Sequence, residues 1–249
     1  MVKVLVHGVP ETADIWTPLR AELEERGVED VVTLSPPGFG APVPPGWSAT
    51  PEAYIDWLAE EVELLDPPVD ALGHDWGTGH VLGLALRRPE LLRSWSVDIA
   101  GLVHPDYEWH DLAQQWQTPD VGEQVIEAMV GLSVADRASA YEAAGAFDEG
   151  ICRRMAEAMD PAMGACILTL YRHGAQPYPR RLGEQLVAAR PGPGLVLTAT
   201  EDAYVPAELG REMAARLDAQ HVSLPDQGHW WMLSRPDLAA EALADFWRR

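Results

Sequence analysis

The chain has 249 residues, of which 47% are hydrophobic and 23% charged, an ordinary globular composition that excludes disordered, collagen-like and disulfide-stapled classes. Asp and Glu number 39 against 18 Lys and Arg, which gives a formal net charge of −21. This charge repels nucleic acid and anionic membrane surfaces, so we expect neither as a partner.

The sequence shows no membrane-spanning segment, signal peptide or cysteine motif. No stretch approaches the roughly 20 apolar residues that a membrane-spanning helix needs. The run from Met1 to Val6 is too short for a signal peptide. Cys152 and Cys166 lack the spacing of a metal or redox motif, and we expect both to be reduced thiols. These features predict a cytoplasmic protein.

Short apolar strands alternate with helices over the first hundred residues. The patterns predict strands at 2–6, 31–34, 69–72 and 95–99, and helices at 15–26, 50–65 and 78–88. Thr50 followed by Pro51 is typical of a helix start. Alternation of this kind predicts a parallel sheet with helices on both faces.

The alternation stops between residues 104 and 190. Apolar spacings of three and four predict helices at 120–130, 133–144, 148–159 and 161–173, and a linker at 174–181. Strands at 195–198 and 221–224 and helices at 206–217 and 236–247 then resume the rhythm. We therefore predict an α/β core domain of residues 1–103 and 191–249 with a helical cap domain of residues 104–190. A cap inserted there would lie over the carboxyl ends of the strands, where open α/β sheets bind ligands.

The segment from Gly73 to Gly77, between a predicted strand and a helix, has the pattern of a nucleophile elbow. Such a turn strains the backbone of its middle residue, so the flanking positions must lack bulk. The middle residue is Asp75, and a carboxylate is a nucleophile for saturated carbon whose product is an alkyl ester. This pattern argues against ordinary esterase or protease chemistry, which needs an alkoxide or a thiolate. An Asp that only caps a helix is the plainer alternative.

A histidine and an acid are expected to complete a triad. His229 follows the last predicted strand, and the order nucleophile, acid, histidine is one that hydrolytic triads use. The acid must hold the histidine tautomer and stabilise its cation. Asp202 is the first candidate, its neighbour Glu201 a weaker one, and Asp98 a rival, since an Asp in an apolar strand needs a partner.

The loop after the first strand, from His7 to Pro10, is the third signal. A loop in this place can direct a backbone N–H at the nucleophile. We therefore expect the N–H groups of Val9 and Trp76 to form an oxyanion hole.

Taken together, these motifs resemble the epoxide hydrolase and haloalkane dehalogenase branch of the α/β-hydrolase superfamily, over nearly the whole chain. In family order they are His7–Glu11, His74–Gly77, Asp202 and Gly228–Trp230. The resemblance implies an α/β-hydrolase fold, a nucleophile at Asp75, a water-activating His229 and an acid at Asp202. Because the strand at 2–6 leads directly into the first motif, we expect a mostly parallel, doubly wound sheet of about six strands that lacks the N-terminal strands usual in the family.

The cap distinguishes the members of this branch. Epoxide hydrolases usually carry two cap tyrosines that hydrogen-bond the epoxide oxygen. The run Leu168–Arg172 resembles the segment with the second tyrosine, which implies this role for Tyr171. At the first tyrosine position the chain has Leu112, and Tyr107 and Tyr141 are the candidates to replace it.

Dehalogenases instead hold a halide with indole N–H groups. Trp76 matches the donor after the nucleophile, and Trp116 is the candidate for a second. Asp98 also matches the place where some dehalogenases keep their acid. We expect these two tryptophans, with the cap tyrosines, to bind substrate in either reaction.

The resemblance implies hydrolysis of a small apolar epoxide to a vicinal diol through an ester on Asp75, without a cofactor or a metal. The first alternative is a haloalkane dehalogenase with the same nucleophile. The second is a non-catalytic binding protein with the hydrolase fold. We expect a monomer or a homodimer.

Overall fold

The computed structural model describes all residues from Met1 to Arg249 and contains one six-stranded sheet. The strands are β1 (Lys3–Val6), β2 (Val31–Leu34), β3 (Val69–Gly73), β4 (Leu92–Val97), β5 (Gly194–Ala199) and β6 (Gln220–Leu224). They lie in the order β2-β1-β3-β4-β5-β6, and every neighbouring pair is parallel. This sheet confirms the predicted fold class and strand number.

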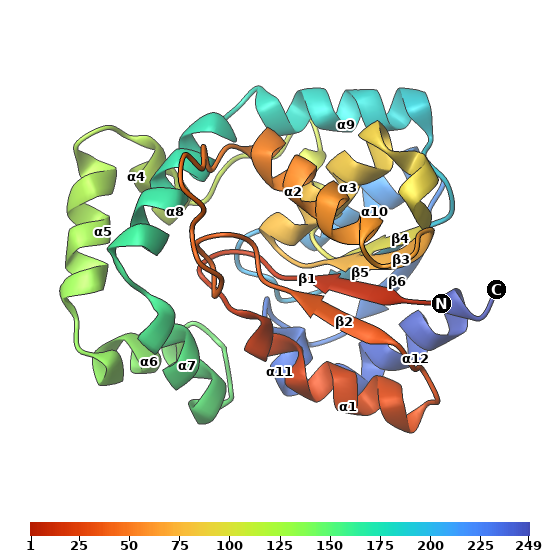
Figure 1. The fold of residues 1–249 in the computed structure, drawn as a ribbon, viewed down its shortest axis with the longest axis horizontal. Helices are drawn as coiled ribbons and strands as arrows, with labels where there is room; N and C mark the ends of the chain where they lie inside the picture. Colours follow the sequence, from red (N-terminus) through yellow and green to blue (C-terminus); the bar gives the residue numbers. More distant parts are fainter.

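Helices cover both faces of the sheet, as Figure 1 shows. One face carries α1 (Thr17–Glu25), α11 (Trp231–Ser234) and α12 (Pro236–Trp247), and the other carries α2 (Pro51–Glu63), α3 (Trp76–Arg87) and α10 (Ala207–Arg216). Strands β3 and β5 are buried along their whole length. Alternate residues such as Leu72 and Ala71 pack into separate apolar clusters on the two faces, as a parallel sheet requires.

Six helices separate β4 from β5. They are α4 (Asp111–Gln117), α5 (Val121–Gly131), α6 (Val134–Ala143), α7 (Glu149–Ala158), α8 (Pro161–His173) and α9 (Tyr178–Ala189). Helices α4 to α8 form a group beside the carboxyl ends of the strands (Figure 1), whereas α9 returns along the core and contacts α3. The side chains of Ser133, Asp148 and Asp160 cap three of these helices.

The structure corrects three boundaries. The predicted linker at 174–181 runs into α9, which begins at Tyr178, because a proline at position 179 lies in the first helical turn, where its missing N–H is not needed. Helix α4 was not predicted. Strand β4 begins at Leu92, earlier than the predicted 95, and ends at Val97.

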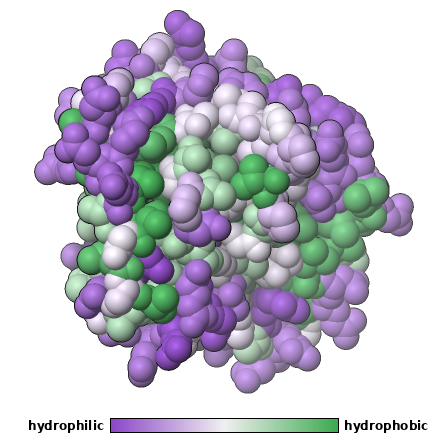
Figure 2. Space-filling model, turned by 60° about the vertical axis from the view of Figure 1, so that its left-hand side comes forward, coloured by the Kyte–Doolittle hydropathy of each residue, from purple (hydrophilic) through white to green (hydrophobic).

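The surface over the inserted helices is mixed in character. Figure 2 shows hydrophobic patches there that are separated by charged and polar side chains. The large apolar side chains most exposed in this part of the chain are Val121, Leu132 and Phe147. None of the helices has the length and the apolar character that crossing a bilayer would require. Both cysteines are free thiols in buried positions.

Gly194, at the start of β5, allows a stability prediction. A Cβ there would lie 2.1 Å from the ring of Trp95, which is buried and donates its indole N–H to Pro191 O over 2.7 Å. We expect Gly194→Ala to lower the free energy of unfolding by about 1–3 kcal/mol through overpacking. Gly131→Ala is the control, because no atom lies within 4 Å of that added Cβ. Urea unfolding of both variants checks this, and equal stabilities would contradict it.

Candidate active site

Asp75 lies on a sharp turn between β3 and α3. Its φ of +51° and ψ of −124° are rare for a residue with a side chain. A Cβ on Gly73 would approach Gly77 O to 2.3 Å, and one on Gly77 would approach Val6 O to 2.1 Å. The turn therefore requires both flanking glycines, as the sequence pattern indicated, and it leaves the Asp75 side chain 13% exposed.

One oxygen of the Asp75 carboxylate is held by the loop after β1. Val9 N donates a hydrogen bond to Asp75 Oδ1 over 2.8 Å. The loop passes so close that a Cβ on Gly8 would lie 2.1 Å from the same oxygen. The N–H of Trp76, the other predicted donor, begins α3 and makes no hydrogen bond to the carboxylate. Oδ1 is thus fixed by one N–H, while Oδ2 is free of backbone donors.

His229 stands between two carboxylates. Its Nδ1 donates to Asp202 Oδ2 over 2.8 Å, and its Nε2 lies 3.7 Å from Asp75 Oδ2. The other oxygen of Asp202 accepts from the backbone N–H groups of Tyr204 and Val205, over 2.8 and 3.0 Å. Both oxygens of Asp202 are therefore engaged, and they fix the orientation of the imidazole. The gap of 3.7 Å exceeds a hydrogen bond.

The two other acid candidates do not contact His229. Asp98 pairs with His74 Nδ1 and accepts from Trp231 Nε1 over 2.8 Å and from Thr78 Oγ1 over 3.3 Å. Its position in the apolar core is thus explained by these partners, since a buried carboxylate needs donors. Glu201 is exposed.

Sequence reasoning missed a buried charge network beneath Asp75. His74 donates from Nε2 to Glu11 Oε1 over 3.1 Å and from Nδ1 to Asp98. Because both ring nitrogens face carboxylates, both carry protons. Burial opposes this charge, but Asp98 and Glu11 outweigh it and raise the pKa of His74 well above its usual range. Glu11 and His74 both lie in sequence motifs already singled out, and the fold buries both of them. Ionisable residues inside those motifs were the sequence feature that could have indicated the network.

Glu11 also ties two parts of the site together. It accepts from Gly8 N over 3.0 Å and from Trp230 Nε1 over 2.6 Å. Burial would raise the pKa of Glu11, but His74 lowers it to about 2. Glu11, His74 and His229 place ligand atoms within 4.8 Å of one another, yet a metal ion there would have to replace the pair between Glu11 and His74. The set is therefore better suited to positioning than to metal binding.

Burial sets the charge states of the two residues that face each other. Loss of solvent raises the pKa of Asp75 to about 6, with His229 lowering it and Glu11 raising it further. Burial disfavours the cation of His229, but Asp202 overcomes this and raises the pKa of His229 above its ordinary value. The carboxylate is thus less acidic, and the imidazole more basic, than either would be in water.

A cavity of about 170 Å³ opens onto these groups and is lined mostly by hydrophobic side chains. Of the predicted residues, Val9, Asp75, His229, Tyr171, Trp116 and Tyr141 line it. Leu112, His110 and Tyr204 line it as well, and the last two were not predicted. The cavity therefore brings most of the predicted site together between the sheet and the inserted helices.

Two predicted substrate-binding residues do not line this cavity. Tyr107 is buried, and its hydroxyl points to Tyr204 O at 3.5 Å. The Trp76 ring stacks on Trp109 with centroids 5.5 Å apart and contacts the cavity residue Tyr171 edge-on at 5.3 Å.

Tyr171, on α8, presents a phenol to the cavity. Its ring contacts those of Trp116 and Trp76 edge-on, with centroids 4.8 and 5.3 Å apart. Burial and the charge of Asp75 raise the pKa of Tyr171 well above its usual range. The phenol therefore keeps its proton and is available as a donor.

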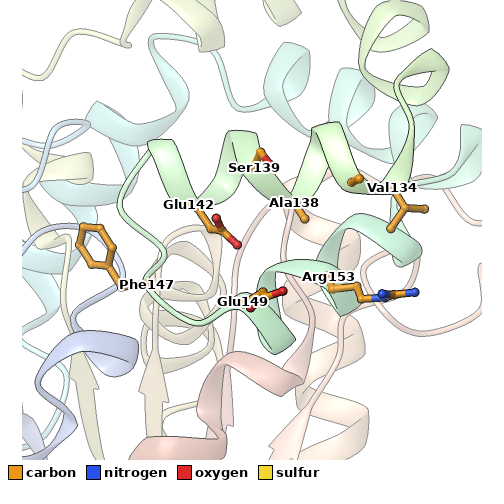
Figure 3. Close-up of a pocket in the computed structure, with 8 residues that line it drawn as sticks. Val134, Ala138, Ser139, Glu142, Phe147, Glu149 and Arg153 are labelled. Carbon is orange, nitrogen blue, oxygen red and sulfur yellow. The ribbon is translucent and has the colours of Figure 1, made fainter.

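A larger hollow of about 710 Å³ lies elsewhere, between α6 and α7, and is open to solvent. Figure 3 shows Glu142, Glu149 and Arg153 along it, with Phe147 on the connecting loop. It holds none of the predicted site residues.

Comparison with known proteins places these features in a family. A sequence model of the alpha/beta hydrolase family matches residues 4–242. An (E)-2-((N-methylformamido)methylene)succinate hydrolase from Acinetobacter baylyi is 30% identical over 95 residues, which span 38% of this chain and 35% of that protein.

Solved structures with the same fold cover nearly the whole chain. An esterase from Thermogutta terrifontis matches 100% of this chain and 89% of its own, with 22% identity and a TM-score of 0.76. A meta-cleavage product hydrolase from Pseudomonas fluorescens matches 100% and 90%, with 16% identity and a TM-score of 0.74. A haloalkane dehalogenase from Bradyrhizobium elkani matches 98% and 89%, with 21% identity and a TM-score of 0.69. On the match over residues 4–242, the chain belongs to the alpha/beta hydrolase family.

Proposed function

We propose that this hydrolase opens small apolar epoxides to vicinal diols through a covalent ester on Asp75. The observation that carries the proposal is a carboxylate at the elbow, with one oxygen held by Val9 N and the other facing a cavity and His229. A carboxylate in this place attacks saturated carbon and forms an alkyl ester. Tyr171 is a protonated donor on the same cavity, which an alkoxide leaving group needs.

In the first step, Asp75 Oδ2 attacks a ring carbon and the carbon–oxygen bond of the epoxide breaks. The departing oxygen takes the proton of Tyr171 Oη, so the products are an alkyl ester and a phenolate. His229 does not remove a proton in this step, because the carboxylate is already a nucleophile.

In the second step, His229 Nε2 takes a proton from water, and the resulting hydroxide attacks the carboxyl carbon of Asp75. The 3.7 Å between Nε2 and Oδ2 is too long for a direct hydrogen bond, so the base meets the water and not the carboxylate. The oxyanion forms at Oδ1, where Val9 N already donates and Trp76 N is free. The departing alkoxide takes the proton of His229 and leaves as the diol, which leaves Asp75 as a carboxylic acid. This acid then gives its proton to the Tyr171 phenolate, and both side chains return to their starting states.

The charge of Asp75 also controls the pKa of His229 during the reaction. While Asp75 is ionised, its charge contributes to the raised pKa of His229. Formation of the ester removes this charge at 3.7 Å, so the pKa of His229 falls. The imidazole thus becomes a neutral base after the ester has formed, when the second step needs it.

One observation favours haloalkane dehalogenation as a second candidate. The indole N–H groups of Trp116 and Trp76 are buried without any hydrogen-bond partner, and Trp116 lines the cavity. Unpaired indole donors can hold a departing halide, which needs no proton.

The covalent route predicts where oxygen from water appears. In a single turnover in ¹⁸O water, the label should enter the Asp75 carboxylate and not the diol. With His229→Gln, the ester should form and persist, because the second step has lost its base. Mass spectrometry of the peptide containing Asp75 checks both. Label found only in the product would show that no ester lies on the pathway. Normal turnover by His229→Gln would show that His229 is not the base of the second step.

The pH dependence follows from the burial of Asp75. The nucleophile must be ionised, and its pKa is raised to about 6, so the rate of ester formation should rise through about pH 6 and then stay level. Tyr171 keeps its proton beyond its usual range, so no loss is expected up to about pH 10. In His229→Gln this rise in the rate should occur at higher pH, because the variant has lost a cation that lowers the pKa of Asp75. Stopped-flow alkylation rates check this, and a limb near pH 4 in both proteins would contradict it.

Tyr171→Phe separates the two candidate reactions. Loss of the donor should slow epoxide opening by about 10²–10⁴, the usual contribution of a general acid. Release of bromide from a bromoalkane should hardly change, since bromide leaves without a proton. Diol and bromide are measured in parallel on both proteins. Bromide release without any diol from the parent enzyme would favour the dehalogenase.

A further inference from the structure

His110 is a cavity residue to which the sequence assigned no role. It precedes α4 and lines the cavity with Asp75 and His229. Its ring lies 4.8 Å from that of Tyr204, which in turn packs at 4.7 Å against His229. The ring of Tyr204 therefore connects His110 to His229 along the cavity wall.

The backbone fixes the tautomer of this histidine. Ala113 N donates to His110 Nδ1 over 3.3 Å, so this nitrogen is an acceptor and carries no proton in the neutral ring. Burial and the charge of His229 lower the pKa of His110 to about 4, against the smaller opposing effects of Asp202 and Asp111. At neutral pH the ring is thus neutral and holds its single proton on Nε2.

That N–H has no partner in the protein. The only hydrogen bond of the His110 side chain is the one at Nδ1. An unpaired donor beside an apolar cavity loses free energy unless a ligand accepts from it. Two other cap side chains bring donors to this cavity, the hydroxyl of Tyr171 and the unpaired indole N–H of Trp116, whereas Leu112 offers no polar atom. Of these donors, the hydroxyl of Tyr171 and the Nε2–H of His110 are oxygen-directed groups that an epoxide oxygen can accept from as it develops negative charge, while the indole of Trp116 is the donor that would suit a halide.

We propose that His110 Nε2–H donates a second hydrogen bond to the epoxide oxygen while Tyr171 donates the first. This inference rests on the proposed epoxide hydrolysis and adds a catalytic residue to it. As the carbon–oxygen bond breaks, the proton moves from Tyr171 to the oxygen, and His110 keeps its own proton throughout. A neutral imidazole suits this role because it stabilises an alkoxide without becoming its acid.

His110→Asn tests the proposal with the helix start preserved. Asparagine is a good N-cap and can still accept from Ala113 N, but its shorter side chain withdraws the donor from the cavity. Single-turnover kinetics with styrene oxide separate ester formation from ester hydrolysis. We expect ester formation to slow by at least about 10-fold, in line with the loss of one oxyanion donor, with hydrolysis of the ester changed less than about 2-fold.

Leu112→Ala is the matched control, since it reshapes the same wall without removing a donor. It should weaken substrate binding and leave the rate constant of ester formation less affected than in His110→Asn. If both steps slow together in His110→Asn, the residue acts only through structure and the proposal is wrong. If ester formation is unchanged, the oxygen does not meet His110, and the proposal is again wrong.

The outcome for the parent enzyme keeps the two proposals apart. Diol formation by the parent enzyme with an unaffected His110→Asn overturns the role of His110 alone. No diol from the parent enzyme overturns epoxide hydrolysis and the role of His110 with it. An independent check is ¹⁵N NMR of the imidazoles, which should show His110 as the Nε2–H tautomer at neutral pH, and the Nδ1–H tautomer would contradict the proposal.

Discussion

The backbone conformation of Asp75 is the constraint on which the site depends. A non-glycine residue held outside the favoured regions costs on the order of 1–3 kcal/mol, and the surrounding structure must impose it. Here the buried strand β3 and the start of α3 impose it, and three glycines remove every Cβ that would stop the chains from approaching. The approach of Gly8 is the least obvious of these, because it sets the distance between Asp75 and its only backbone donor.

The electrostatics of the site follow from how little solvent reaches it. Four carboxylates, those of Glu11, Asp75, Asp98 and Asp202, share the cluster with the imidazoles of two histidines, His74 and His229. His74 is bonded to two of the carboxylates and His229 to a third. Asp75 has no cation bonded to it, so burial and the nearby Glu11 raise its pKa. The least compensated carboxylate of the cluster is therefore the one that we propose as the nucleophile.

The sequence predicted the parts of this arrangement that are local. The periodicity of the strands and the spacing of Gly73 and Gly77 around Asp75 are contained within a few consecutive residues. The order of the elements along the chain was enough to place Asp202 and His229 after the last two strands. The network of Glu11, His74 and Asp98 joins residues 63 and 24 positions apart, and no local pattern reports such pairing.

The cap was harder to predict for a related physical reason. Apolar spacing locates helices 120–130 and 161–173 but not the side of each that faces the core. Tyr107 and His110 lie in a segment for which no element was predicted, just before α4, so no periodicity could say which of the two side chains faces the cavity. Tyr107 was expected there and does not line it, whereas His110 was not expected there and does. The N-cap bond of His110 was equally hidden, since histidine is not among the residues that usually begin a helix.

The shared fold cannot identify the reaction, because similar structures include an esterase, a meta-cleavage product hydrolase and a haloalkane dehalogenase. The proposed nucleophile, Asp75, limits which of these reactions the site can perform. Attack of Asp75 on an ester carbonyl would give an anhydride, which is more reactive than the substrate, whereas attack on saturated carbon gives a stable ester. The leaving group then distinguishes dehalogenation from epoxide opening. A halide departs as a weak base and needs no acid, but an alkoxide must be protonated, and the phenol of Tyr171 keeps its proton on the wall of the cavity.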